Sequence, residues 1–409
     1  MKVLLINSWS HEGSTGKITF GLFQYLNSHG HQALLCCRGT RESKINDSRI
    51  IPLVSPLEHK LAVLGTRITG YDGVFNRRAT RKVIKLIEEF KPDIIQLFNL
   101  HAYYLNSYEL LEYLKKKPQT PVVYVMFDEF PYMGRCCFSV GCNQFKTECV
   151  KCPHQINYPR SLWFDRASYC FKRKKKIYQD FSHITFASVK WCCERAKESA
   201  LLKHHRILEL DNPINYDDVF YPRNTEQLKK DLGIPYGNKV IMTVAVASIP
   251  TKGGKYFVEL AQMMQNHKDI TFVYVGYDVN DWDIPQNMIT IGFVKSQDLL
   301  AQYYSMADLF VCTSLADLTP NACLDALGCG TPLAGFSEGG VPYCASEEFG
   351  TFVKTFDMNA LAEVVEKTPK KTEKRIKDVR DYAYNRYSSN LVYEKYVKMY
   401  KSILENNGV

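Results

Sequence analysis

Residues Thr313 to Pro332 read TSLADLTPNACLDALGCGTP, and this stretch decides how the chain folds. Residues 309–313 form a short apolar run that is typical of a buried strand. Thr319-Pro320 is typical of a helix start, because a proline in the first turn loses no hydrogen bond. The glycines of Gly328-Cys329-Gly330 end that helix. The stretch therefore predicts a strand, a loop and a helix in succession.

Two aspartates lie within this stretch, Asp317 in the predicted loop and Asp325 on the predicted helix. In an open α/β sheet, ligands bind beside the carboxyl ends of the strands, where such a loop lies. Carboxylates at that place are good acceptors for the hydroxyl groups of a sugar. Taken alone, the pair favours the simpler interpretation of two solvated acids in an ordinary Rossmann-like domain.

The whole stretch resembles the signature of the retaining nucleotide-sugar glycosyltransferases of the GT-B fold, in the family usually numbered four. That signature is a Glu, seven residues, a second Glu, and then Ala-Met/Leu-x-Cys-Gly-Thr-Pro. Here Asp317 and Asp325 take the two Glu positions, while Ala326-Leu327 and Cys329-Gly330-Thr331-Pro332 are kept. The resemblance implies two Rossmann-like domains that face one another across a cleft, with a C-terminal helix crossing back to the N-terminal domain.

Apolar strand patterns alternate with helical patterns through both halves of the chain, which indicates parallel sheets with right-handed crossovers. The strand candidates are 2–7, 33–37, 93–98, 122–127, 240–245, 271–276, 309–313 and 333–336. The helical candidates are 16–27, 79–90, 107–117, 255–265, 296–306 and 321–327. A chain of 409 residues is long enough for two domains, since single cores stop growing near ~250–300 residues.

The join between the domains is predicted at Asn212-Pro213-Ile214, which resembles the interdomain turn of the same family. We expect an acceptor-binding domain over residues 1–213 and a nucleotide-sugar-binding domain over 214–385. The C-terminal helix of 386–409 should pack on the first domain, as the resemblance implies.

Lys252 is the main candidate for contact with the donor. It stands in Ser248–Gly254, which follows a predicted strand and opens a helix, and a helix N-terminus beside a lysine suits a diphosphate. The resemblance implies that Lys252 contacts the donor diphosphate, that Asp317 holds hydroxyls of the donor sugar, and that Asp325 accepts from the ribose. The further donor-binding residues that it implies are Gly16, Gly253, Thr319 and Asn321. The arginine that the family carries a few residues upstream is missing here.

Residues after the strands of the first half are candidates for the acceptor side. Gly13-Ser14-Thr15-Gly16-Lys17 matches the glycine-rich loop of the family, but it is too short for a Walker-type phosphate loop. His101 resembles the histidine of the family's Asn-x-His turn, and Gly13 and His101 are expected on the acceptor side. Asp128 is expected to hydrogen-bond the acceptor hydroxyl and to act in catalysis, although Phe127 stands where related enzymes carry histidine.

Residues 133–154, MGRCCFSVGCNQFKTECVKCPH, form a cysteine-rich insertion. Cys136, Cys142, Cys149 and Cys152 have the number and spacing of a structural Zn(Cys)4 site, and the alternative is a set of small buried thiols. Four thiolates leave no open coordination position, so such a zinc would be structural. No Asp-x-Asp motif stands directly at the end of a predicted strand, so we expect no cofactor for catalysis.

The composition predicts a globular, cytoplasmic protein with reduced cysteines. No apolar run approaches the ~20 residues needed to span a bilayer, and the net charge of +9 is moderate. The densest basic run, residues 172–176, lies near Trp163 and Phe164. It predicts either the solvated face of a helix or peripheral docking on the inner face of a membrane that carries a lipid-linked acceptor.

The sequence as a whole predicts a retaining glycosyltransferase that acts on a nucleoside-diphosphate sugar and a glycan or lipid-linked acceptor. The expected setting is the synthesis of capsular polysaccharide, exopolysaccharide or lipopolysaccharide. A GT-B epimerase of sugar nucleotides is the first alternative. An adaptor for membranes or nucleic acid is the second, and the donor-site signature argues against it.

Overall fold

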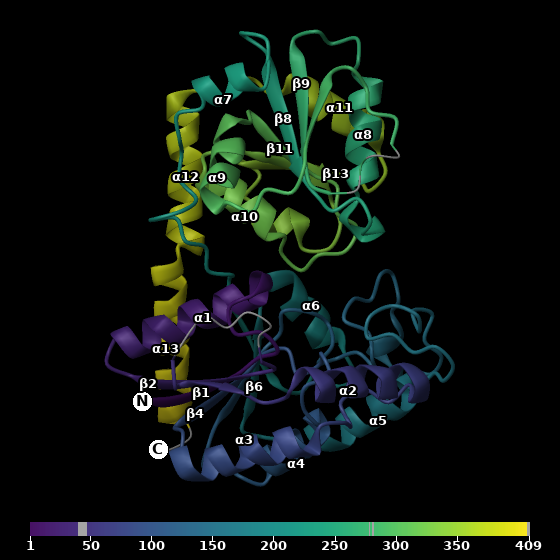
Figure 1. The fold of residues 1–409 in the computed structure, drawn as a ribbon, viewed down its shortest axis with the longest axis vertical. Helices are drawn as coiled ribbons and strands as arrows, with labels where there is room; N and C mark the ends of the chain where they lie inside the picture. Colours follow the sequence, from purple (N-terminus) through teal and green to yellow (C-terminus); the bar gives the residue numbers. More distant parts are fainter. Residues whose placement is uncertain (40–46, 278, 280–281, 407–409) are drawn as a thin grey trace. The chain divides into compact units, whose positions relative to one another are not determined.

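The computed structural model describes residues 1–39, 47–277, 279 and 282–406. The chain divides into two compact units, one made of Met1–Leu210 with Tyr393–Val409 and the other of Asp211–Val392 (Figure 1). Among the described residues, no helix is both long enough and apolar enough to cross a membrane.

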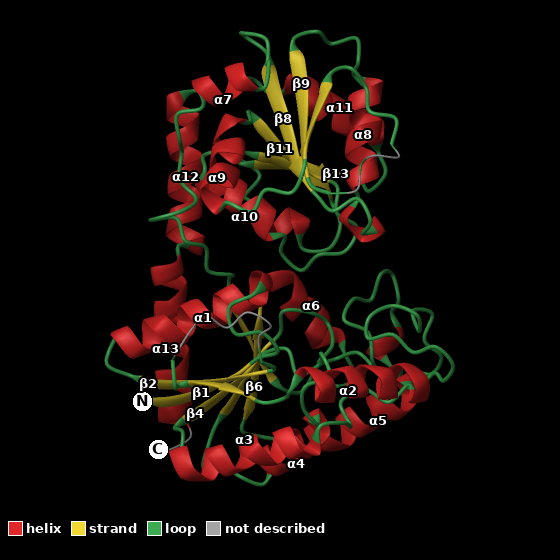
Figure 2. Ribbon diagram, in the orientation of Figure 1, coloured by secondary structure: helices red, strands yellow, loops and turns green. Residues whose placement is uncertain are grey.

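The first unit is built on a seven-stranded sheet in the order β3-β2-β1-β4-β5-β6-β7, and all of its strand pairs are parallel (Figure 2). The strands are β1 (Lys2–Ile6), β2 (Gln32–Cys37), β3 (Ile50–Pro52), β4 (Ile94–Leu97), β5 (Val122–Val125), β6 (Ile184–Ser188) and β7 (Arg206–Glu209). The helices are α1 (Gly13–Ser28), α2 (Pro56–Thr69), α3 (Arg77–Phe90), α4 (Ser107–Lys115), α5 (Ala167–Tyr178) and α6 (Lys190–Glu198), with the 3-10 turn η1 (Gln144–Lys146). β4 and β5 are buried along their whole length, as strands of a sheet covered on both faces must be.

The second unit is built on a six-stranded parallel sheet in the order β10-β9-β8-β11-β12-β13. Its strands are β8 (Lys239–Val244), β9 (Ile270–Val275), β10 (Met288–Ile291), β11 (Leu309–Cys312), β12 (Leu333–Phe336) and β13 (Gly350–Val353). Its helices are α7 (Glu226–Asp231), α8 (Gly254–Met263), α9 (Gln297–Met306), α10 (Asn321–Gly328), α11 (Met358–Lys367) and α12 (Glu373–Tyr387), with the 3-10 turns η2 (Pro250–Lys252) and η3 (Val341–Cys344). The predicted α/β class with two parallel sheets is confirmed.

Side chains of the second sheet alternate between two apolar cores, one on each face. Along β8, Val240 and Met242 belong to one core while Ile241 belongs to the other. In β11, Phe310 and Val311 divide between the two cores in the same way. This alternation follows from the two-residue repeat of a strand, and it explains why the strands read as continuous apolar runs.

The last helix, α13 (Ser389–Asn406), ends in the first unit. There the Tyr393 hydroxyl donates to the carbonyl of Ile18 over 3.3 Å. The Tyr400 hydroxyl donates to Oε1 of Gln96 over 2.9 Å, and both residues are buried. The C-terminal segment is therefore part of the core of the first unit.

Each sheet has one place where the chain reverses its direction of winding. In the first unit it lies between β1 and β4, and in the second between β8 and β11. At such a switch point the loops that follow the two strands diverge and leave a crevice at the carboxyl ends, which is where open α/β sheets bind ligands. The predicted site residues can be located relative to these two crevices.

Candidate functional site

The loops that follow β8 and β11 are bonded together at the switch point of the second unit. The N–H of Leu315 donates to the carbonyl of Thr251 over 2.7 Å, and Oγ1 of Thr313 donates to the carbonyl of Gly253 over 3.0 Å. Gly253 has a φ of +69°, and a Cβ there would strike the carbonyl of Thr313. Glycine is therefore required for the two loops to come so close.

Lys252 and Asp317 form an ion pair in this crevice. Nζ of Lys252 lies 2.9 Å from each carboxylate oxygen of Asp317, and Oγ of Ser314 donates to Oδ2 over 2.7 Å. The Lys252 side chain is 39% exposed and the Asp317 side chain 14%. The pair thus lies at the rim of the crevice, where a ligand can reach the ammonium group.

Three of the other predicted donor residues, Thr319, Asn321 and Asp325, lie on or just before α10. The side chain of Asn321 accepts a hydrogen bond from Nδ2 of Asn212 over 3.2 Å. Asp325 lies one turn further along α10, on the same side of the helix. Burial first, and then the charge of Asp325, raise the pKa values of the Tyr216 and Tyr304 phenols well above the ordinary range. Thr319 donates to the carbonyl of Leu318 over 2.7 Å.

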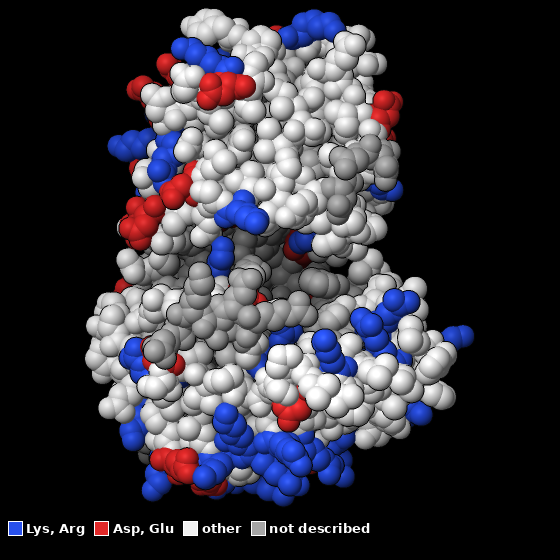
Figure 3. Space-filling view, in the orientation of Figure 1, with Lys and Arg blue, Asp and Glu red and all other residues white. Residues whose placement is uncertain are grey.

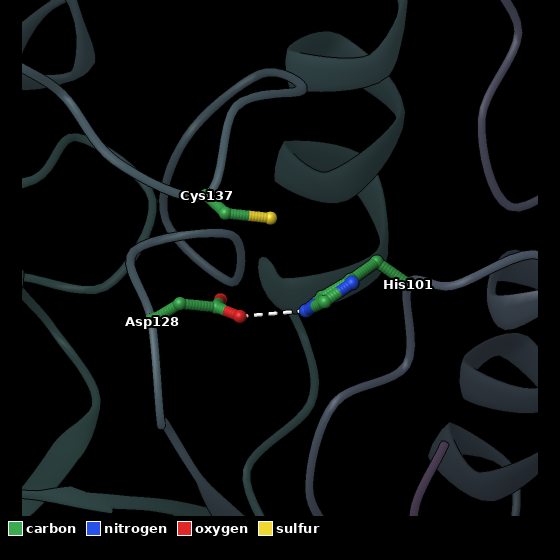
Figure 4. Close-up of side chains that lie close together, drawn as sticks. All are labelled: His101, Asp128 and Cys137. Carbon is green, nitrogen blue, oxygen red and sulfur yellow. Dashed lines mark hydrogen bonds and ion pairs between the residues drawn. The ribbon is translucent and has the colours of Figure 1, made fainter. Parts of the chain in front are cut away.

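His101 and Asp128 form the centre of the candidate site in the first unit (Figure 4). His101 follows β4 and Asp128 follows β5, and the two strands are neighbours in the sheet. Nε2 of His101 lies 2.6 Å from Oδ2 of Asp128, and both residues are buried. The predicted acceptor-side residues His101 and Asp128 are therefore brought together by two neighbouring strands.

The hydrogen bonds around this pair determine its orientation. Asp128 also accepts from Nδ2 of Asn99 over 3.1 Å and from the N–H of Phe130 over 2.9 Å. Nδ1 of His101 lies 3.1 Å from the Tyr158 hydroxyl, and in the neutral tautomer that carries its proton on Nε2 it accepts a hydrogen bond from this hydroxyl. Burial raises the pKa of that hydroxyl well above its ordinary value.

Tyr158 is a residue of this site that sequence reasoning missed. It lies just beyond the predicted insertion, and its ring is partly exposed while its hydroxyl turns inward to His101. Nη2 of Arg135, inside the insertion, donates to the carbonyl of Pro159 over 2.9 Å and holds the Tyr158 segment in place. No sequence motif marks Tyr158, because its contact with His101 spans 57 positions of the chain.

The backbone just after His101 is strained. Ala102 and Tyr103 have φ angles of 77° and 61°, in the left-handed region that residues with a Cβ rarely adopt. Nδ2 of Asn76 holds this turn by donating to the carbonyl of Tyr103 over 2.7 Å. Each such residue costs about 1–3 kcal/mol, and strain of this kind gathers at functional sites.

The predicted glycine-rich loop, residues 13–17, forms the first turn of α1, because this helix begins at Gly13 and not at residue 16. Gly13 is the first residue of α1 and has a φ of +65°. A Cβ on Gly16 would lie 3.0 Å from Cβ of Trp9 and 3.1 Å from the backbone of His11. Gly16 therefore allows the helix to pack closely on the loop that follows β1. The binding roles of Gly13 and Gly16 stay predictions.

The cysteines of the insertion gather in one place. The Cys136 thiol donates to Cys152, which raises the pKa of Cys136 and lowers that of Cys152 to about 7. Backbone N–H groups of Gly134 and His154 donate to the sulfurs of Cys149 and Cys152. Burial is the main reason that the pKa of Cys149 is raised to about 11, and nearby Cys142 adds to the shift.

Four thiols are a suitable donor set for a structural zinc. However, the sulfur atoms of Cys136, Cys142, Cys149 and Cys152 do not all lie within metal-binding distance of one another. Among the described residues, His101, Asp128 and Cys137 are the only group of three or more potential ligands whose ligand atoms all lie within 4.8 Å of one another. The hydrogen bond between His101 and Asp128 accounts for the closeness of two of these three residues. Zinc at the quartet stays a prediction.

The basic run of residues 172–176 is only partly a solvated face. Lys174 is 2% exposed and donates from Nζ to the carbonyls of Phe130 and Met133 over 2.5 and 3.0 Å. Its ammonium group also lies 3.5 Å from the centre of the Phe130 ring. Lys174 therefore anchors the loop that carries Asp128 and cannot contact a membrane.

Comparison with known proteins agrees with the fold and with the donor-site signature. Residues 238–369 match the family model of glycosyl transferases group 1. WcaC of Escherichia coli (strain K12), provisionally named as a colanic acid biosynthesis glycosyl transferase, is 32% identical over 93 residues. That alignment spans 22% of this chain and 23% of WcaC.

Two solved structures resemble nearly the whole chain. A glycosyltransferase from Rickettsia africae has a TM-score of 0.69 at 15% identity, with 99% of each chain covered. Alr3699/HepE of Anabaena, solved in complex with UDP and glucose, has a TM-score of 0.64 at 14% identity, with 98% of this chain and 100% of HepE covered. At such low identity the likeness shows the fold, which is the GT-B fold of two Rossmann-like domains.

Proposed function

We propose that the chain is a retaining glycosyltransferase that moves a sugar from a nucleoside-diphosphate sugar to a hydroxyl of a glycan or lipid-linked acceptor. The observation that carries the proposal is the Lys252–Asp317 ion pair. It lies at the β8–β11 switch point, within the segment that matches glycosyl transferases group 1. Retention of configuration is inferred from the resemblance of the Asp317–Asp325 signature to that of the retaining family.

Lys252 acts on the leaving diphosphate in this proposal. Charge that develops on the diphosphate is stabilised by the ammonium group and by the N-terminus of α8, where no side chain caps the helix. Because Lys252 holds Asp317 through both oxygens, donor binding has to exchange part of this ion pair for contacts with phosphate. Asp317 then becomes free to accept hydrogen bonds from the donor sugar.

The remaining donor contacts come from neighbouring residues. Asp325 accepts from the ribose hydroxyls, and aspartate, one methylene shorter than glutamate, needs a closer approach or a bridging water. Additional contacts are assigned to Gly16, Gly253, Thr319 and Asn321. The reaction uses no divalent ion in this proposal, because the lysine and the helix N-terminus supply the positive charge.

The acceptor is assigned to the first unit. Asp128 hydrogen-bonds the attacking hydroxyl, while His101 and Asn99 hold its carboxylate in place. Gly13 lets the backbone approach the acceptor closely. The product is a surface polysaccharide or lipopolysaccharide intermediate, and the local similarity to WcaC supports this class. Zinc at Cys136, Cys142, Cys149 and Cys152 would be structural.

The test is a thermal-shift panel of nucleoside-diphosphate sugars, followed by a transfer assay with the donor that binds. Selective binding raises the melting temperature of the wild type by mass action. Lys252→Ala should lose the shift, and the matched surface variant Lys268→Ala should keep it. NMR of the product then determines whether the anomeric configuration is retained.

Three outcomes would count against this function. Conversion of the donor alone into an isomer would identify an epimerase. Salt-sensitive binding of RNA or DNA with no shift by any nucleotide sugar would identify an adaptor. A product of inverted configuration would contradict the retaining mechanism but leave glycosyl transfer intact.

A further inference from the structure

Helix α2 turns its apolar stripe away from the core of the first unit. Leu57, Leu61, Leu64 and Ile68 are 67%, 59%, 54% and 37% exposed. At about 100° of rotation per residue, these four side chains fall within an arc of about 60°. Ala62 and Thr66, the buried residues of the helix, lie on the opposite side. A helix of a soluble domain normally points such a stripe inward, so the orientation of α2 requires an explanation.

The stripe continues onto the segment that follows the cysteine insertion. The N–H of Leu162 donates to the carbonyl of Arg67 over 2.9 Å, which joins this segment to the last turn of α2. Leu162, Trp163 and Phe164 are 43%, 66% and 50% exposed. We call the surface formed by Leu57, Leu61, Leu64, Ile68, Leu162, Trp163 and Phe164 the apolar patch.

Close packing contacts join α2 to the segment that carries Leu162, Trp163 and Phe164. Gly70, which caps α2 with a φ of 74°, packs against the carbonyl of Phe164. The guanidinium group of Arg166 lies 4.7 Å from the centre of the Tyr71 ring. The exposed apolar side chains therefore belong to a single ordered surface, not to a loose loop.

Positive charge borders the apolar patch. Lys60 and Arg67 are exposed and follow one another along one flank of the leucine stripe, and Arg160 is exposed beside the aromatic segment. Two acidic residues near these basic side chains, Glu58 and Asp165, already accept hydrogen bonds from the backbone. Glu58 closes the capping box of α2, and Asp165 accepts from the N–H groups of Cys152 and Ala167. Basic side chains are also prominent over the first unit in the space-filling view (Figure 3).

We propose that the apolar patch docks the first unit on an anionic lipid bilayer. An amphipathic helix with a leucine stripe, lysine or arginine on its flank and a neighbouring Trp and Phe is the composition that lies in the plane of a membrane interface. Anionic lipids complement Lys60, Arg67 and Arg160, whereas the apolar side chains enter the boundary of the acyl chains. In this proposal, docking takes place through α2 and residues 162–164.

The apolar patch is connected to the candidate acceptor site. Tyr158, which donates to His101, precedes Leu162 by four residues on the same segment. A lipid-linked acceptor held in the bilayer would therefore be presented near the His101–Asp128 pair. Docking itself does not depend on the proposed function, but this delivery of the acceptor rests on it.

Vesicle co-sedimentation tests the docking. The full chain should bind vesicles that contain phosphatidylglycerol and bind much less to phosphatidylcholine alone. Leu61→Gln combined with Leu64→Gln should weaken binding to the anionic vesicles at least ten-fold. Glutamine suits an exposed helix nearly as well as leucine, so circular dichroism should stay unchanged. Lys60→Gln with Arg67→Gln should remove the preference for anionic lipid.

The control is Tyr236→Gln with Met263→Gln, which removes two exposed apolar side chains of the second unit and should leave vesicle binding unchanged. Absence of binding by the wild type, or full binding by the leucine variant, would overturn the proposal. So would a leucine variant that changes only the oligomeric state in light scattering, since a second copy would then be the partner. Transfer to a water-soluble acceptor by the leucine variant would separate failed docking from failure of the proposed function.

Discussion

Nε2 of His101 lies 2.6 Å from Oδ2 of Asp128, although the two residues lie in loops that follow different strands. The contact exists because β4 and β5 pair in parallel, with Leu97 opposite Tyr124, so the two loops leave the sheet side by side. The tertiary structure therefore brings together two side chains that lie 27 positions apart in the chain.

Replacement of either residue of this pair should impair sugar transfer. His101→Gln and Asp128→Asn are expected to lower kcat by a factor of about 10²–10⁴, the usual range when a positioned acid–base group is lost. Steady-state transfer assays with the donor identified by thermal shift would measure the effect. His29→Gln, an exposed histidine of the same unit, should leave kcat unchanged. Wild-type kcat in Asp128→Asn would remove this residue from the mechanism.

Tyr158 should act as a positioning residue for His101. Tyr158→Phe removes the hydroxyl that donates to Nδ1 but keeps the ring, so kcat should fall about ten-fold. The free energy of unfolding should change by only about 1 kcal/mol, as expected for one hydrogen bond. Kinetics and urea unfolding on the same preparation would separate the two effects. A loss of stability as large as the loss of transition-state stabilisation would indicate a purely structural role.

The Lys252–Asp317 pair should matter for catalysis far more than for stability. Lys252→Met and Asp317→Asn are each expected to lower kcat by about 10²–10³, and the double variant should be little worse than either single one. The free energy of unfolding should fall by less than about 1 kcal/mol, since Lys252 is 39% exposed and solvent screens the pair. A double-mutant cycle in kcat/KM would measure the coupling between the two residues. Fully additive effects of the two substitutions would contradict a shared role.

Lys174 should be a major contributor to the stability of the first unit. Lys174→Met leaves the carbonyls of Phe130 and Met133 without their donor and should cost about 2 kcal/mol or more in urea unfolding. The exposed neighbour Lys175→Met should change stability by no more than about 0.5 kcal/mol.

The stability conferred by Lys174 should also depend on pH. Burial lowers the pKa of Lys174, and the nearby Cys170 and Asp72 only partly oppose this effect. The folded state therefore binds this proton more weakly than the unfolded state. Stability should consequently rise as the pH increases from the lowered pKa towards the ordinary value of about 10.4. Lys174→Met should lack that rise, and an unchanged pH profile in the variant would contradict the assignment.

The cysteine quartet should bind about one zinc per chain if the spacing prediction is correct. Metal analysis of the purified protein would measure this, and Cys142→Ser with Cys149→Ser should lose the metal while Cys344→Ala keeps it. In the metal-free protein the hydrogen bond from Cys136 lowers the pKa of Cys152, so this thiol should be alkylated at a lower pH than an ordinary cysteine. Less than about half an equivalent of zinc in the wild type would count against the site.

Much of the second unit could be predicted from the sequence. The strand predicted at 333–336 coincides with β12, and the helix predicted at 321–327 differs from α10 by one residue. These elements have strong local signals, namely buried apolar runs bounded by proline and glycine. The predictions omitted α2, although Ser55 and Glu58 form a capping box at its start. Its apolar residues face outward, so periodicity alone could not reveal which side of the helix is buried.

The sequence by itself determined which residue types stand at the ends of the strands, because strand, loop and helix signals are local. It assigned Lys252 and Asp317 to the donor side and His101 and Asp128 to the acceptor side, without any contact between them. Only the tertiary structure decided that Lys252 pairs with Asp317 and His101 with Asp128. Which loops become neighbours depends on the order and register of parallel strands, and these are determined by contacts between segments far apart in the chain.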